Sequence, residues 1–150
     1  MMSLMDRIQE DLKAAMKSRD TLRLETLRTL RAVLLEKEIE KRGPGPGMTA
    51  EDELGTLMTA AKKRRESIEQ FRIGGRPELA EQEEKELAII QEYLPKQLSP
   101  DEINSVIKDA LATTGAGDFG KVMPLVMKQV KGKADGKVVQ ELVKKALGAA

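Results

Sequence analysis

The sequence predicts an all-α protein in which a bundle of long helices is followed by a compact three-helix domain. Leu, Ala, Met, Glu, Lys and Arg dominate the composition, and these residues favour helices. Aromatic residues, on which β-sandwiches and barrels usually draw, make up only 2% of the chain. Apolar residues recur almost throughout at the three- and four-residue spacing of one helix face, which supports the same fold class.

Two helices are expected before a loop rich in glycine and proline. Ser3 is the expected N-cap of the first, whose apolar stripe reaches Ala15. The second starts at residue 20 or 21 and runs to about Arg42. The Gly-Pro-Gly-Pro-Gly sequence at 43–47 ends it, because proline cannot continue a helix. This sequence lacks the Gly-Lys-Ser/Thr ending of a phosphate-binding P-loop, so we interpret it as a flexible connection.

The third and fourth helices are expected to fold back on each other around the glycine pair at 74–75. Thr49 has the position of the N-cap in a capping box, and the third helix runs from there to about residue 73. The fourth runs from Pro77, a residue favoured in the first turn of a helix, to about Tyr93. Residues 1–94 are therefore predicted to form an N-terminal helical domain.

Charged residues occupy the predicted apolar stripes of these two helices. Turning each helix by 100° per residue places Arg65 on the stripe of the third and Glu83 on that of the fourth, with Glu86 at its edge. When the helices pair, Arg65 is expected opposite Glu83 or Glu86. We interpret this arrangement as an interhelical ion pair that sets the register of the helices. A polar site for a ligand or partner is the alternative.

Residues 99–150 are expected to form a separate domain, with a border at residues 94–99. The sequence Ser-Pro-Asp-Glu at 99–102 combines a Ser cap, a Pro in the first turn and a Glu three residues after the cap, which marks a helix N-terminus. Glycines at 115 and 117 end this helix.

Two further helices complete the C-terminal domain. The first is expected from about Asp118 to Val130, where Pro124 should kink the helix or delay its start. A loop at 132–136 leads into the last helix. Its buried side is predicted to contain Val138, Leu142, Val143 and Ala146.

The composition disfavours most kinds of catalysis. The chain has no Cys and no His, so it lacks a thiolate nucleophile, the commonest general base and the commonest metal ligand. Carboxylates lie mostly beside Lys or Arg, as on a solvated surface. We therefore predict no catalytic residue, no metal site and no cofactor. No segment approaches the ~20 apolar residues of a membrane span, and residues 1–12 carry charges where a signal peptide needs an apolar run. These observations predict a cytoplasmic protein without membrane contact.

The stretch 117–150 is the most one-sidedly charged part of the chain. It contains seven Lys and three acidic residues, a local net charge of +4. Asp118 and Asp135 have N-cap positions, so their charges are expected to bind backbone N–H groups. Basic loops of this kind suit phosphate contacts, with lysines that merely keep the domain soluble as the alternative. The basic run at 62–65 is a weaker signal, because acidic residues follow it on the same helix.

Several motifs resemble the YqeY family. They are Arg-Arg-Glu-Ser-Ile-Glu-Gln-Phe at 64–71, Glu-Glu-Lys-Glu-Leu at 83–87 and Tyr-Leu-Pro at 93–95. Two more, Asp-Phe-Gly-Lys-Val-Met at 118–123 and Lys-Gly-Lys-Ala-Asp-Gly-Lys at 131–137, are also similar to the tail of GatB, the B subunit of the glutamine-dependent tRNA amidotransferase. The resemblance covers essentially the whole chain, and the motifs are specific only in combination.

The resemblance implies a two-part helical protein whose C-terminal part is like a tail that helps to hold tRNA. In the amidotransferase, amide transfer occurs in a separate large domain for which this chain has no room. The resemblance therefore carries over RNA contact rather than a catalytic role. The residues in or beside the matching motif are Lys121, Lys128, Lys131, Lys133 and Lys137.

Three hypotheses remain open from the sequence. The first is a non-catalytic module that binds tRNA or associates with tRNA-dependent amidotransferase activity. The second is a helical adaptor for a protein partner, for example one of the translation machinery, without RNA contact. The third is a carbon–nitrogen ligase of the amidotransferase type, which the missing His, Cys and catalytic domain disfavour.

Overall fold

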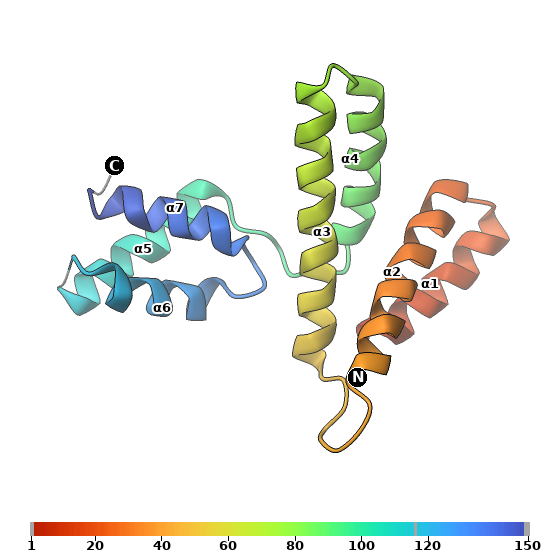
Figure 1. Ribbon diagram of the computed structural model, residues 1–150, viewed down its shortest axis with the longest axis horizontal. Coiled ribbons are helices and arrows are strands. Elements are labelled where there is room, and N and C mark those ends of the chain that lie inside the picture. Colours follow the sequence, from red (N-terminus) through yellow and green to blue (C-terminus); the bar gives the residue numbers. More distant parts are fainter. Residues whose placement is uncertain (1, 116, 149–150) are drawn as a thin grey trace. The chain divides into compact units, whose positions relative to one another are not determined.

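The computed structural model describes residues 2–115 and 117–148 of the chain. Every helix or strand in these residues is an α-helix, which confirms the predicted fold class (Figure 1). The chain divides into two compact units, Met1–Leu94 and Pro95–Ala150, here called the N-terminal and C-terminal units. The helices are α1 (Leu4–Ser18), α2 (Thr21–Glu40), α3 (Ala50–Ile73), α4 (Pro77–Gln91), α5 (Pro100–Thr114), α6 (Phe119–Val130) and α7 (Gly136–Ala146).

Capping boxes start three of these helices. Ser3, Thr49 and Ser99 each accept a hydrogen bond from the backbone N–H three residues on, and the carboxylate at that position accepts one from the cap's own N–H. The backbone hydrogen bond from the cap lowers the pKa of Asp52, and likewise that of Glu102, below its ordinary value. A cap of this kind stabilises a helix by about 0.5–2 kcal/mol, so short-range sequence signals determine where these helices begin.

The N-terminal unit consists of two helical hairpins, α1–α2 and α3–α4, which share one core. Leucines of α2 and α3 meet Ile8 of α1 and Ile90 of α4 in a fully buried cluster. The loop that joins the hairpins has three glycines with positive φ, at 43, 45 and 47, so it needs the conformational freedom that glycine alone has. From this loop α2 and α3 diverge (Figure 1).

Two polar contacts close the bundle around α1. The Glu53 carboxylate on α3 accepts a hydrogen bond of 3.0 Å from the backbone N–H of Met5, at the start of α1. The Tyr93 hydroxyl, just after α4, donates to the Asp11 carboxylate of α1. Burial, together with the neighbouring Asp11 charge, raises the pKa of Tyr93, so the phenol remains protonated and remains a donor.

The C-terminal unit packs α5, α6 and α7 around a valine- and isoleucine-rich core. Its helix α6 starts at Phe119, ahead of Pro124, so the expected delay at the proline is wrong. The missing N–H of Pro124 frees only the carbonyl of Gly120, and both residues are exposed, so water can satisfy it. The fully buried side chains are Ile103, Ile107, Val122, Val126, Val130 and Val139.

The buried side of α7 differs from the prediction. Val138, expected in the core, is 40% exposed, and Ala146 is also exposed. Val139 and Val143, four residues apart, make the core contacts instead. The first member of the predicted stripe was therefore one residue early, and one residue on a helix is a rotation of 100°.

We expect residues 95–150, prepared alone, to fold into a helical unit of marginal stability. The unit has its own core, but about 50 residues is near the lower limit for independent folding. Circular dichroism should show a helical spectrum at low temperature and a melting transition well below that of the whole chain. A fragment without helical signal would show that the predicted 99–150 domain does not fold separately.

Candidate nucleic-acid interface

Charge is divided unevenly between the two units. Residues 1–94 carry 17 Lys and Arg against 19 Asp and Glu, a net charge of −2. Residues 95–150 carry nine Lys against six acidic residues, a net charge of +3. All ten Arg lie in the N-terminal unit. The total of +1 therefore conceals a basic unit whose cations are all lysines.

The loop from Lys131 to Asp135 presents two lysines to solvent. Gly132 and Ala134 are buried, and they alternate with exposed Lys131 and Lys133. The carbonyl of Lys133 accepts a hydrogen bond of 2.8 Å from the Leu98 N–H. The carbonyl of Gly132, a residue with φ of 80°, accepts one of 3.0 Å from the side chain of Gln97. Because the backbone of this loop is held at both points, its lysines project from a defined position.

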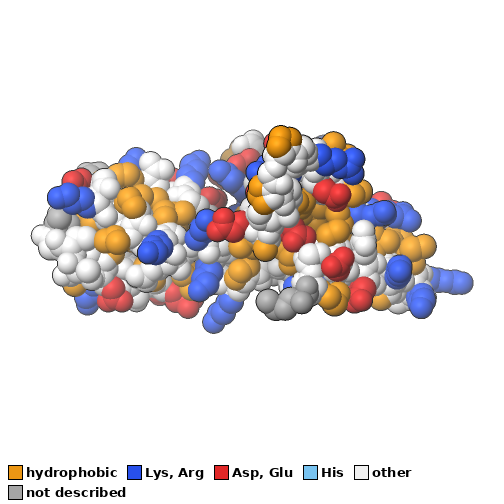
Figure 2. Space-filling view, turned by 90° about the horizontal axis from the view of Figure 1, so that it is seen from below, with side chains coloured by type: hydrophobic (Ala, Val, Ile, Leu, Met, Phe, Trp, Pro, Cys, Tyr) orange, Lys and Arg blue, Asp and Glu red, His pale blue; other side chains and the backbone are white. Residues whose placement is uncertain are grey.

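The other three predicted lysines lie on the helices that flank this loop. Lys121 and Lys128 on α6 are seven residues apart, nearly two turns, so they share one side of the helix. Lys137 lies in the first turn of α7. All three are exposed, and Figure 2 shows lysine side chains projecting from the C-terminal unit.

Few carboxylates neutralise these lysines. Among the described residues, Lys121, Lys128, Lys133 and Lys137 form no ion pair, whereas arginines of the N-terminal unit such as Arg23 and Arg28 do. The Asp118 carboxylate accepts a hydrogen bond from the Gly120 N–H at 2.9 Å, and that of Asp135 accepts one from the Lys137 N–H at 3.1 Å. Both aspartates are N-caps, as predicted, so any phosphate bound here meets lysines rather than open helix N-termini.

The ion pair between α3 and α4 uses a different arginine from the predicted one. Arg64 lies 2.9 Å from a carboxylate oxygen of Glu83 and 2.9 Å from one of Glu86, whereas the prediction named Arg65. The buried stripe of α3 runs through residues 53, 57, 61 and 68, and position 64 falls on it. Arg65 is half-buried beside it, where it lines a hollow with Ile68 and Leu87.

The three charges of this cluster do not balance. One guanidinium faces two carboxylates, and each of the three side chains is about four-fifths buried, with 22%, 18% and 17% exposure for Arg64, Glu83 and Glu86. Burial raises the pKa of Glu86 and the Glu83 charge adds to this rise, while Arg64 opposes it. The cluster joins two helices and has no substrate-sized space of its own, so we interpret it as structural.

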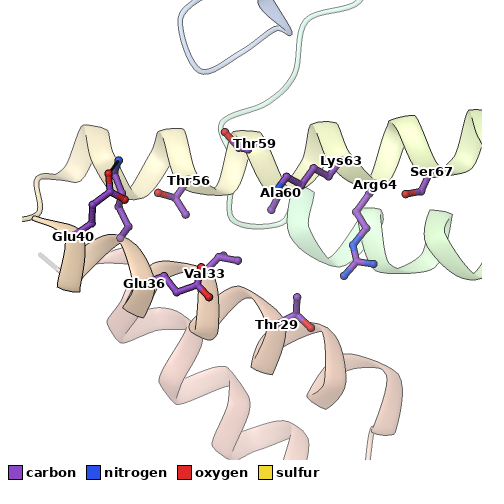
Figure 3. A pocket seen from close by; sticks show the side chains of 11 residues that line it. Thr29, Val33, Glu36, Glu40, Thr56, Thr59, Ala60, Lys63, Arg64 and Ser67 are labelled. Atoms are coloured by element: carbon purple, nitrogen blue, oxygen red, sulfur yellow. Dashed lines mark hydrogen bonds and ion pairs between the residues drawn. The ribbon is translucent and has the colours of Figure 1, made fainter.

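A groove between α2 and α3 is the second candidate site, and the sequence did not predict it (Figure 3). The hollow measures about 450 Å³, with Val33 and Ala60 among its apolar lining residues. Three threonines also line it, at positions 29, 56 and 59, and each hydroxyl donates to a backbone carbonyl of its own helix. Lys63 on its α3 wall has no carboxylate partner among the described residues. The groove therefore offers a free cation and hydroxyl acceptors.

The described residues show no further chemical centre. They contain no cluster of three carboxylates that could hold a metal ion. Within the same part of the chain, no helix combines the length and the apolar character that a bilayer crossing requires.

Comparison with known proteins identifies the family. A family model described as "Yqey-like protein" matches residues 5–147. The chain belongs to the YqeY-like family. The predicted resemblance is thus confirmed, and it extends across both units of this YqeY-like protein.

Three relatives show how far the similarity reaches. "Altered inheritance of mitochondria protein 41, mitochondrial" of Pyrenophora tritici-repentis is 30% identical over 151 residues, covering 97% of this chain and 82% of the relative. The protein of the same name from Lachancea thermotolerans is 37% identical over 87 residues, 58% of this chain and 46% of its own. A glutamyl-tRNA(Gln) amidotransferase polypeptide of Archaeoglobus fulgidus is 55% identical over 42 residues, 28% of this chain and 7% of that polypeptide.

These relatives contradict the predicted cytoplasmic location. Both fungal proteins are named as mitochondrial. The prediction was wrong because it relied on a missing apolar run, which is the mark of a secretory signal. Organelle transit peptides are amphipathic and rich in arginine, so the missing run says nothing about mitochondria.

Proposed function

We propose that this YqeY-like protein is a non-catalytic RNA-binding module whose C-terminal unit contacts the phosphate backbone of tRNA. The observation that carries the proposal is the set of exposed lysines on α6, α7 and the loop between them, most of which lack a carboxylate partner among the described residues. The contacting residues are Lys121, Lys128, Lys131, Lys133 and Lys137.

The similarity to the archaeal amidotransferase supports an association with tRNA, since that relative is named as a glutamyl-tRNA(Gln) amidotransferase. The match covers only 7% of that polypeptide, so its activity does not follow from the match. The lack of Cys and His disfavours catalysis, because the chain has no thiolate nucleophile and no imidazole base. Binding is the function that these residues can perform without a further domain.

Binding of total tRNA should weaken steeply with salt. Each lysine–phosphate contact releases condensed counterions, so five contacts give a slope of log affinity against log salt of roughly −3.5 to −4.5. Replacing Lys131, Lys133 and Lys137 with Ala should flatten this slope by about two to three units. Filter binding across a salt series measures both values.

The matched control for this experiment lies in the N-terminal unit. The double variant Lys62→Ala and Lys63→Ala also removes exposed cations, but from the unit with net negative charge, so it should change the slope by less than about one unit. If the wild-type protein binds no tRNA even at low salt, the RNA proposal is wrong.

The α2–α3 groove favours a second candidate function, that of a protein-binding adaptor. Its walls extend over three turns of α2, about 17 Å, a length that suits one helix of a partner protein. We propose that such a helix places an acidic side chain against Lys63. A protein that co-purifies without RNA, and that Ala60→Trp releases by filling the groove, would support this function over tRNA binding.

A further inference from the structure

We infer that the C-terminal unit recognises the phosphate backbone of a double-helical RNA stem and does not read base sequence. This inference rests on the proposed RNA binding and names the kind of RNA that fits the same surface. Three features of the unit carry it: its cations, its aromatic residue and the rigidity of its lysine positions.

The cations of this unit are unsuited to reading bases. Residues 95–150 contain nine lysines and no arginine. The planar guanidinium of arginine binds guanine bidentately and stacks on bases, whereas the ammonium of lysine is a point charge on a flexible stem. Exposed lysines such as Lys128 and Lys133 therefore meet phosphates well and distinguish bases poorly.

The unit also lacks an open platform for stacking single-stranded bases. Phe119 is its only aromatic residue by sequence. The ring is partly buried against the core of the unit, and the Lys144 ammonium lies 5.9 Å from its centroid. Proteins that bind single strands stack successive bases on exposed aromatic rings, each stacked base contributing about 1–3 kcal/mol. Without such rings, a flexible strand gains little that offsets the entropy of ordering it.

The lysine positions are preorganised. Lys121 and Lys128 lie about 10 Å apart along α6, whose opposite side is anchored by three fully buried valines. Lys133 lies in a loop held by hydrogen bonds from Gln97 and Leu98. Fixed cations match phosphates that are themselves fixed, as in a stem, and neither partner then loses much conformational freedom.

The test compares three RNA probes with the whole protein at one salt concentration. The probes are a hairpin with a stem of about 16 base pairs, a second hairpin with a scrambled stem, and an oligouridine with the same number of phosphates. Fluorescence anisotropy should show about tenfold tighter binding of the hairpin than of oligouridine, because stacking does not compensate the single strand. The two hairpins should bind within about twofold of each other, since the lysines do not read bases.

A Phe119 variant separates stacking from backbone contact. Phe119→Leu keeps an apolar side chain in the core and should leave the ratio of hairpin to oligouridine affinity unchanged. Phe119→Met provides a second substitution should the first reduce the helical signal. Oligouridine binding as tight as hairpin binding, or a loss of it in both Phe119 variants, would overturn the duplex inference while leaving RNA binding in place. Binding of total tRNA alone, by neither hairpin, would overturn it as well, and binding of no RNA would remove the proposed function with it.

Discussion

Arg64→Ala is expected to lower the free energy of unfolding by about 2–3 kcal/mol at pH 7, between the values for an exposed and a fully buried ion pair. The substitution removes the guanidinium that the structure places against both Glu83 and Glu86 and leaves two partly buried carboxylates beside each other. A loss of this size would be a large fraction of the stability of a small helical protein.

The effect of Arg64→Ala should depend on pH. Burial raises the pKa of Glu86 in the folded protein, so the folded state holds this proton more tightly than the unfolded chain does. Stability from this group is therefore fully present below about pH 4.5 and is lost as pH rises through the higher folded pKa. Without Arg64 the pKa rises further, so the difference between variant and wild type should be largest near neutral pH and should shrink towards about pH 4.

Urea unfolding of Arg64→Ala at about pH 7 and about pH 4.5 measures this prediction, with Lys62→Ala as the control. Lys62 is exposed on the same helix and forms no ion pair among the described residues, so its removal should cost less than about 0.5 kcal/mol. Equal losses in the two variants, or a larger loss for Arg64→Ala in acid, would contradict the structural role of the cluster.

Ile107→Ala is expected to unfold the C-terminal unit and leave the N-terminal unit helical. Ile107 on α5 is 1% exposed, and truncating a buried isoleucine to alanine costs about 2–5 kcal/mol. A unit of this size rarely has more than about 3–5 kcal/mol of stability from its core. The proposed tRNA binding should then fall to background, because the lysines lose their fixed positions.

Thermal circular dichroism, limited proteolysis and filter binding measure this second effect together. Proteolysis should cut Ile107→Ala within residues 95–150 first. Leu125→Ala is the control, since Leu125 lies in the same unit on α6 but is 38% exposed and should lose less than about 1 kcal/mol. Simultaneous melting of both units in Ile107→Ala would show that they are not independent.

The helix boundaries and the basic surface were predictable because their signals are local. The caps at Ser3, Thr49 and Ser99 act on backbone groups two or three residues away, so they need no tertiary contact. The predicted caps at Asp118 and Asp135 follow the same rule. Exposure of the five lysines follows from the cost of burying an unpaired ammonium, which a sequence shows without a structure.

Other features needed the packing of helices that are distant in the sequence. Arg64 rather than Arg65 faces Glu83 because the side of α3 that meets α4 is set by the whole bundle, and a helical wheel read from one helix is uncertain by one position. The same rotation placed Val139 in the core in place of Val138.

The sequence by itself determined where the helices start, that the chain is all-α, and that its last third is basic, because each of these depends on neighbouring residues or on composition. Only the tertiary structure decided which arginine joins α3 to α4, how Gln97 and Leu98 hold the lysine-bearing loop, and that α2 and α3 leave a groove between them. Each of these depends on how elements far apart in the chain meet, and a rotation of 100° or a change in crossing angle costs nothing in local sequence preference.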